Sequence, residues 1–183
     1  MLMNLPTLLT ISRIVLLPII IIVFYLDYQW ARPLSCAIFL LAGITDWLDG
    51  YLARKWGQES RFGAFLDPVA DKLMVASVLI LMVEFDNSPW LTIPAIVIIG
   101  REITISALRE WMAEMGQRGK VAVSWLGKLK TTLQIVALAM LLYLHPLFGL
   151  PIYKLGMIAL YMATALTIWS MVAYLQAAFA RPE

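Results

Sequence analysis

Residues 34–85 read LSCAIFLLAGITDWLDGYLARKWGQESRFGAFLDPVADKLMVASVLILMVEF. Two apolar stretches are joined here by a short polar connection, and four aspartates lie where the stretches meet it. Each stretch is close to the roughly 20 residues that an α-helix needs to cross a bilayer core about 30 Å thick. Charged side chains in or beside such spans cost free energy and usually mark functional sites. The segment therefore predicts two membrane helices that carry a cluster of acids at one membrane edge.

The composition of the whole chain also indicates a lipid environment. Of the 183 residues, 62% are hydrophobic and 14% are charged, and the mean hydropathy is +0.83. A soluble domain is nearer half apolar and about a quarter charged. We therefore expect residues 1–183 to form a single domain, an all-α integral membrane protein with six transmembrane helices. The six stretches run over residues 8–26, 34–53, 68–85, 90–111, 126–144 and 152–178.

The first stretch could consist of two helices. Residues 4–13 are interrupted by Pro6 and by several hydroxyl side chains. A short interfacial helix could therefore precede a steeper span that begins at about Val15. Thr10 and Arg13 would then lie near the lipid headgroups. The alternative for Arg13 is a snorkelling side chain that only anchors the helix.

Basic residues gather on alternate connections of the chain and set its orientation. Arg32 and Lys154 are the bases on one side, and the other side carries many more. Cytoplasmic loops carry an excess of Lys and Arg. We therefore expect a multi-pass protein of the cytoplasmic (inner) membrane, with the acids and both termini on the cytoplasmic side. The bases assigned to that side are Arg54, Lys55, Arg61, Arg109, Arg118, Lys120, Lys128 and Lys130.

The four aspartates form two pairs on neighbouring helices. Asp46 and Asp49 are three residues apart, and Asp67 and Asp71 are four apart, so each pair shares a helix face. Antiparallel helices with a short link bring the pairs together, where they repel one another unless protons or cations intervene. Carboxylate ligands suit Mg²⁺, Mn²⁺ or Ca²⁺ rather than zinc, since no His or Cys is nearby. A purely structural role would explain the small residues around them, but not four acids.

The run from Asp46 to Asp71, D-x-x-D-G-x-x-A-R-x8-G-x3-D-x3-D, resembles the motif of the CDP-alcohol phosphatidyltransferases at every motif position. The resemblance implies a six-span fold and transfer of a phosphatidyl group from CDP-diacylglycerol to an alcohol, with release of CMP. It implies two divalent cations, with Mg²⁺ expected ahead of Mn²⁺, bound by the four aspartates Asp46, Asp49, Asp67 and Asp71. Asp71 would also be the general base.

The same resemblance implies a site for the nucleotide of CDP-diacylglycerol. Thr10 and Arg13 would lie at the level of that nucleotide. For Arg54 and Ser60 the alternative is an ordinary cytoplasmic loop. The residues expected to line this site are Gly50, Ala53, Arg54, Ser60 and Gly63.

A second set of charged residues indicates where the acceptor alcohol binds. Arg101 lies inside the fourth apolar stretch, where a charge costs about 2.5–3.5 kcal/mol, and it shares a helix face with Arg109. Lys128 and Lys130 open the fifth stretch. We expect these four bases to bind an acceptor that carries its own phosphate, whereas the alternative is positive-inside topology alone.

The acceptor itself is indicated by a closer resemblance. Residues 4–13 (NLPTLLTISR), 100–103 (GREI), 108–111 (LREW) and 127–131 (GKLKT) resemble the branch of the family whose acceptor is sn-glycerol 3-phosphate. Thr7 departs from the Asn that many members have there. The motif alone leaves inositol phosphate, serine and phosphatidylglycerol open as acceptors.

A divalent-cation transporter is the competing class of function. It would place its acids near the bilayer midplane, at the interface of internal repeats. Here the acids lie towards one basic face, and no repeat is visible. The resemblance also implies a homodimer, although the small residues Gly156, Ala159 and Ala163 could equally pack within one chain. Besides its substrates, we expect membrane lipid and no nucleic acid as partners.

Overall fold

The computed structural model describes residues 5–56, 61–116 and 125–179. Within these ranges the regular secondary structure is all α-helix, joined by turns and short connections, with one isolated bridge between Leu147 and Leu150. The predicted all-α class is confirmed, with six helices; the prediction that all six cross a membrane stays a prediction. The helices are α1 (Leu5–Phe24), α2 (Ala31–Trp56), α3 (Arg61–Asp86), α4 (Pro89–Glu114), α5 (Trp125–Tyr143) and α6 (Ile152–Phe179).

Two of the helices are long and apolar enough to cross a membrane, α4 over its whole length and α6 over Ile152–Gln176. Shorter apolar helical segments lie in α1 (Leu8–Phe24) and in α5 (Leu129–Tyr143). Large apolar side chains also face outward along the helices, as at Ile96 and Trp169. Extended exposed apolar surfaces are typical of proteins that contact a membrane or a partner. The structure is therefore consistent with a membrane protein.

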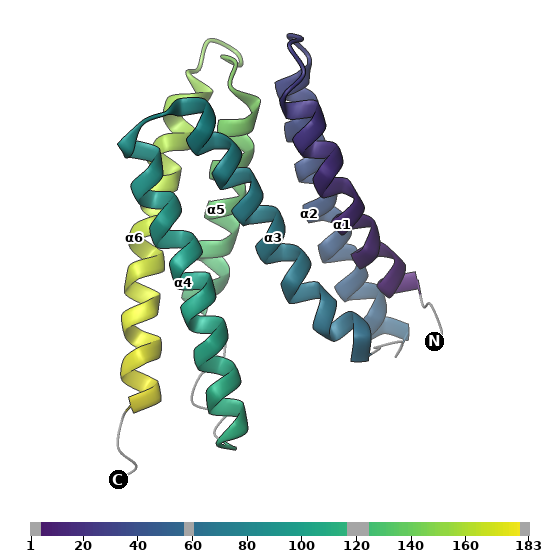
Figure 1. Cartoon of the computed structure of the whole chain (residues 1–183), viewed down its shortest axis with the longest axis vertical. Coiled ribbons are helices and arrows are strands. Elements are labelled where there is room, and N and C mark those ends of the chain that lie inside the picture. Colours follow the sequence, from purple (N-terminus) through teal and green to yellow (C-terminus); the bar gives the residue numbers. More distant parts are fainter. Residues whose placement is uncertain (1–4, 57–60, 117–124, 180–183) are drawn as a thin grey trace.

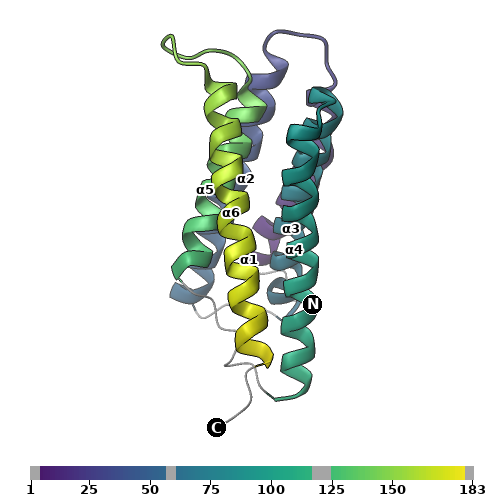
Figure 2. The same cartoon turned by 90° about the vertical axis from the view of Figure 1, so that its left-hand side faces the viewer.

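The helices alternate in direction, so that one end of the bundle collects the beginning of α1, the end of α2 and the beginning of α3 (Figure 1). The end of α6 also lies towards this end, and the turns between α1 and α2, α3 and α4, and α5 and α6 lie at the other. α1 packs against α2 and α3, and α5 packs against α2, α3 and α6. α4 covers the other side of α3 and contacts α6 (Figure 2). α3 thus lies between the α1–α2 pair and the remaining helices.

The main apolar core runs along the inside of this bundle and takes side chains from every helix. Met82 of α3, Ile98 of α4 and Leu138 of α5 are completely buried in it. A second, smaller core joins α4 to α6 through Leu108, Met112 and Tyr174, together with their neighbours. Dense packing of this kind holds α3, α4 and α5 in fixed relative positions.

The two-helix form of the first stretch is wrong. α1 continues without a break from Leu5 to Phe24 and passes through Pro18. Thr10 and Arg13 are buried, and both bond to acids on neighbouring helices. Because both polar side chains have hydrogen-bond partners inside the bundle, α1 can continue as one helix without exposing them to the lipid headgroups.

Candidate active site

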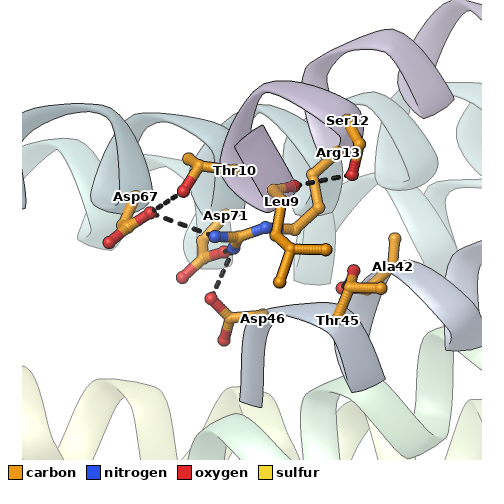
Figure 3. Close-up of polar contacts among 9 residues, drawn as sticks. All are labelled: Leu9, Thr10, Ser12, Arg13, Ala42, Thr45, Asp46, Asp67 and Asp71. Carbon is orange, nitrogen blue, oxygen red and sulfur yellow. Dashed lines mark hydrogen bonds and ion pairs between the residues drawn. The ribbon is translucent and has the colours of Figure 1, made fainter. Parts of the chain in front are cut away.

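The guanidinium of Arg13 is the point on which three of the predicted aspartates converge (Figure 3). Its Nη1 donates to Oδ1 of Asp71 at 2.6 Å and also to Oδ1 of Asp46, while Nη2 lies 3.1 Å from Oδ1 of Asp67. The hydroxyl of Thr10 donates a further hydrogen bond to Asp67. The expected meeting of acids from α2 and α3 is therefore present, with α1 supplying a cation between them.

The exposure of these side chains differs sharply between the base and the acids. Arg13 is 1% exposed, whereas the side chains of Asp46, Asp67 and Asp71 are between 40% and 52% exposed. Three carboxylates against one guanidinium leave a net charge of −2 on this group at neutral pH. The negative charge faces outward, where further cations can approach it.

The donor set fits a divalent metal in chemistry, because carboxylate oxygens from two helices suit Mg²⁺ and Mn²⁺. In the part of the chain that the structure describes, however, no three acidic, His or Cys side chains are arranged around a common metal position. The central position is taken by Arg13, and the Asp49 side chain lies outside the described residues. Sequence reasoning treated Arg13 as an anchor or a nucleotide contact and missed its place among the acids.

Of the residues expected to line the nucleotide site, Gly63 is described and is buried in α3, one helical turn before Asp67. Gly50, Ala53 and Arg54 belong to α2, but their side-chain surroundings lie outside the described residues. Ser60 lies outside them altogether. The predictions for these positions stay predictions.

The bases expected to bind the acceptor fall into two places. Arg101 and Lys130 meet at Glu102, whose Oε1 accepts from Arg101 Nη1 at 2.9 Å and from Lys130 Nζ at 2.7 Å. Both bases are almost fully buried. Arg109 is exposed two turns further along α4, where it donates to the Tyr174 hydroxyl at 3.3 Å. The side chain of Lys128 is outside the described residues.

A cavity of about 230 Å³ lies between α3, α4 and α5. It connects the acid cluster around Arg13 with the group formed by Glu102, Arg101 and Lys130. Asp71 of the acid cluster borders it from α3, and Glu102 borders it from α4. Sequence reasoning missed its other polar side chains, although polar residues inside apolar stretches are the signal that could have found them. They are Lys72, Thr131 and Gln134.

Comparison with known proteins identifies the family. A model of the CDP-alcohol phosphatidyltransferase family matches residues 3–169. The chain belongs to this family. Members of the family generally use divalent cations. The convergence of Asp46, Asp67 and Asp71 in space thus involves three acids of the family motif.

Relatives of similar length share more than half of the sequence. A protein of Salmonella choleraesuis is 54% identical over 96% of this chain and 94% of its own length. A protein of Haemophilus influenzae is 56% identical over 96% and 93%, and one of Sodalis glossinidius is 56% identical over 96% and 95%. Each of them is named a CDP-diacylglycerol–glycerol-3-phosphate 3-phosphatidyltransferase.

Proposed function

We propose that this phosphatidyltransferase moves the phosphatidyl group of CDP-diacylglycerol to sn-glycerol 3-phosphate, giving phosphatidylglycerophosphate and CMP. The observation that carries the proposal is the similarity of 54–56% over nearly the whole chain to relatives named for this reaction. The geometry supports it through Asp71, which belongs to the acid cluster and also borders the cavity.

In the reaction, an oxygen of the acceptor forms a bond to the phosphorus of the phosphatidyl group while the bond from that phosphorus to CMP breaks. Asp71 would take the proton of the attacking hydroxyl; this role is supported by its half-exposed carboxylate in the acid cluster and by its position at the border of the cavity. Two divalent cations, Mg²⁺ ahead of Mn²⁺, would be held by Asp46, Asp49, Asp67 and Asp71. When bound, they supply positive charge that neutralises the pyrophosphate and the CMP leaving group.

The remaining side chains would bind the two substrates. Gly63, one helical turn before Asp67 on α3, would line the site of the nucleotide. Thr10 and Arg13 would stand at the level of the same nucleotide, and Arg101, Arg109, Lys128 and Lys130 would supply positive charge for the acceptor phosphate. The other residues that we assign to the nucleotide are Gly50, Ala53, Arg54 and Ser60.

We also propose that residues 1–183 form one domain whose six helices cross the cytoplasmic membrane. The acid cluster and both termini would face the cytoplasm. Support comes from the alternating helix directions (Figure 1) and from the excess of Lys and Arg on the sequence connections next to the acids.

A homodimer remains part of the proposal, but the small residues of α6 give it no support. A Cβ atom on Gly156 would lie 3.0 Å from Cβ of Met140 and 3.2 Å from Cγ of Leu141, both on α5. Ala163 is also fully buried within the chain. This part of α6 packs inside the protomer, so a dimer would have to use another surface.

Purified protein in detergent, given labelled CDP-diacylglycerol and a panel of acceptors, tests the proposal. We expect CMP release with sn-glycerol 3-phosphate that needs a divalent cation, and little release with serine, inositol phosphate or phosphatidylglycerol. Preference for one of those three acceptors would keep the family chemistry and overturn the choice of acceptor. Absence of CMP release with every acceptor would leave the transporter as the alternative.

A further inference from the structure

A second cavity, of about 530 Å³, lies at the end of the bundle opposite the aspartates (Figure 1). Its wall comes from the turn between α1 and α2, the beginning of α2, the end of α3 and the connection after α5. The volume lies within the roughly 300–1,000 Å³ of small-molecule sites. None of its lining residues belongs to the acid cluster or to the cavity beside Asp71. A ligand here would therefore be separate from the substrates of the proposed reaction.

Arg32 supplies positive charge to this cavity. Its guanidinium lies against two aromatic rings, 3.5 Å from the ring centre of Phe24 and 4.0 Å from that of Phe85. Such contacts hold a guanidinium in place but leave its N–H donors unused. Arg32 makes no ion pair and no hydrogen bond with the residues that the structure describes, and of its three nitrogens only Nη1 is buried. Nε and Nη2 are therefore open to a ligand, and together they suit a phosphate.

Two carboxylates line the same cavity, those of Asp27 and Glu84. Glu84 accepts a hydrogen bond from the Tyr25 hydroxyl and forms no pair with Arg32. With His145 neutral, the two acids and Arg32 give the lining a net charge of −1 at pH 7. A ligand that carries only negative charge would be repelled by the acids, whereas a ligand with a phosphate and an ammonium group has a partner for each charge.

The surroundings of the cavity favour a phospholipid over a small soluble compound. Leu26 and the rings of Phe24 and Phe85 form the apolar part of its wall. Tyr28 also lines it, and its exposed ring stacks on the exposed ring of Trp30 at 5.3 Å between ring centres. Tyr and Trp are enriched where a membrane meets water. The headgroup of a lipid can thus occupy the cavity while its acyl chains lie along the bundle.

We propose that this cavity binds the headgroup of a phospholipid that carries a primary ammonium group, from the leaflet that faces away from the aspartates. Arg32 Nε and Nη2 donate to the phosphate, and the ammonium donates to Asp27 and Glu84. This inference rests on the proposed crossing of the membrane and not on the choice of acceptor. It gives the protein a lipid ligand that is neither the donor nor the product of the proposed reaction.

Native mass spectrometry of the purified full-length protein in detergent, with added lipids of identical acyl chains, tests the proposal. Phosphatidylethanolamine should bind about threefold more tightly than phosphatidylglycerol, since an exposed charge pair is worth up to a few-fold in affinity. Arg32→Met should weaken the binding of phosphatidylethanolamine by about tenfold, because it removes charge-assisted hydrogen bonds to the phosphate. Glu84→Gln should bring the ratio between the two lipids close to one, because the lining then has no net charge.

Lys154→Met is the matched control, because Lys154 is exposed near the beginning of α6, at the same end of the bundle, and does not line the cavity. It should keep the wild-type affinity for both lipids. Glu84 is exposed, so Glu84→Gln should fold even if Arg32→Met does not, and the wild-type ratio needs no variant. sn-Glycero-3-phosphoethanolamine, which lacks the acyl chains, should bind at least about tenfold more weakly than the whole lipid.

Equal wild-type affinity for the two lipids, or a preference for phosphatidylglycerol, would overturn the assignment of an ammonium headgroup, as would an unchanged ratio in Glu84→Gln. Unchanged binding of phosphatidylethanolamine in a folded Arg32→Met would overturn the site. Equally tight binding of the compound without acyl chains would overturn the choice of a lipid. The measurement in detergent depends neither on turnover nor on orientation in a membrane. Absence of CMP release with every acceptor would therefore refute the proposed function and leave this result unaffected.

Discussion

Removal of the charge of Arg13 should destabilise the protein in a way that divalent cations reverse. Arg13→Met keeps most of the apolar volume of a side chain that is 1% exposed, but it leaves three carboxylates facing one another. Removing one partner of a buried ion pair costs about 3–5 kcal/mol, whereas exposed pairs contribute about 0–1 kcal/mol. Because the acids here are 40–52% exposed, water screens them, and we expect an intermediate loss of about 2 kcal/mol without divalent cations.

The single cysteine of the chain offers an assay. Cys36 is buried, and its thiol donates to the carbonyl of Ala139, so a thiol-reactive dye reports unfolding in detergent. A loss of about 2 kcal/mol should lower the unfolding temperature by roughly 4–8 °C for a chain of this size. Adding Mg²⁺ or Mn²⁺ should reduce the difference in unfolding temperature between Arg13→Met and the wild type, since cations then offset the repulsion between the carboxylates. The variant should also bind Mn²⁺ more tightly than the wild type, because Arg13 no longer competes with the metal for the carboxylates. The gain is about tenfold if this competition is worth roughly 1.4 kcal/mol.

Arg32→Met is the matched control for this experiment. Arg32 is the second residue of α2, and α2 begins at the end of the bundle opposite the acids. Its guanidinium lies 3.5 Å from the ring centre of Phe24 and 4.0 Å from that of Phe85. Its loss should destabilise the protein equally with and without divalent cations. Our reasoning is refuted if Arg13→Met unfolds at the wild-type temperature in EDTA. It is also refuted if the loss of unfolding temperature in this variant stays the same when Mn²⁺ is added.

Three further predictions follow from the geometry. Asp71→Asn should lower turnover by about 10²–10⁴-fold, the usual contribution of a general base, while CMP binding measured by calorimetry stays within a few-fold of the wild type. Glu102→Gln should leave the buried Lys130 without its counter-ion and lower the free energy of unfolding by about 1–3 kcal/mol. It should also lower the KM for glycerol 3-phosphate, because Arg101 and Lys130 lose the carboxylate that neutralises part of their charge; an unchanged KM would contradict a role at the acceptor site. Gly156→Ala should destabilise by about 1–3 kcal/mol through overpacking against α5, whereas Gly100→Ala, which meets no atom within 4 Å, should be neutral or stabilising in the same thiol assay.

The convergence of the acids could be predicted because it depends on local geometry. The spacing of Asp67 and Asp71 puts both on one face of α3, and a short link brings that face towards Asp46 on α2. The place of Arg13 could not be predicted in the same way. It is 33 residues from Asp46 and 58 from Asp71, so the contact depends on how α1 packs against both helices. A lone Arg near the end of an apolar stretch is equally typical of a membrane anchor.

The basic residues show a similar limit of sequence reasoning. Arg101 stood out correctly as a charge too deep in an apolar stretch to be a loop residue, and it is indeed buried. Its neighbour Glu102 holds both Arg101 and Lys130, a pairing that depends on the distance between α4 and α5. Periodicity gives the face on which a residue lies but not its partner across the interface. Gln134 went unnoticed for the same reason, since only the packing of α3, α4 and α5 places it beside a cavity.

The position of Asp71 favours direct displacement over a covalent intermediate. Its carboxylate bonds to Arg13, and the residue also borders the cavity between α3, α4 and α5, so an acceptor in that cavity would lie next to the acid cluster. A covalent route needs a nucleophile at the acids with a base to activate it. Neither the only Cys nor the only His of the chain lies there: Cys36 bonds to Ala139 in the core, and His145 packs against Tyr143 beyond the end of α5. The Thr10 hydroxyl, which donates to Asp67, is a candidate nucleophile at the acids, and the stereochemistry at phosphorus tests it. A single in-line displacement inverts the configuration at phosphorus, whereas two successive displacements retain it. Inversion with a chiral phosphorus substrate is therefore expected, and retention would require a nucleophile on this chain.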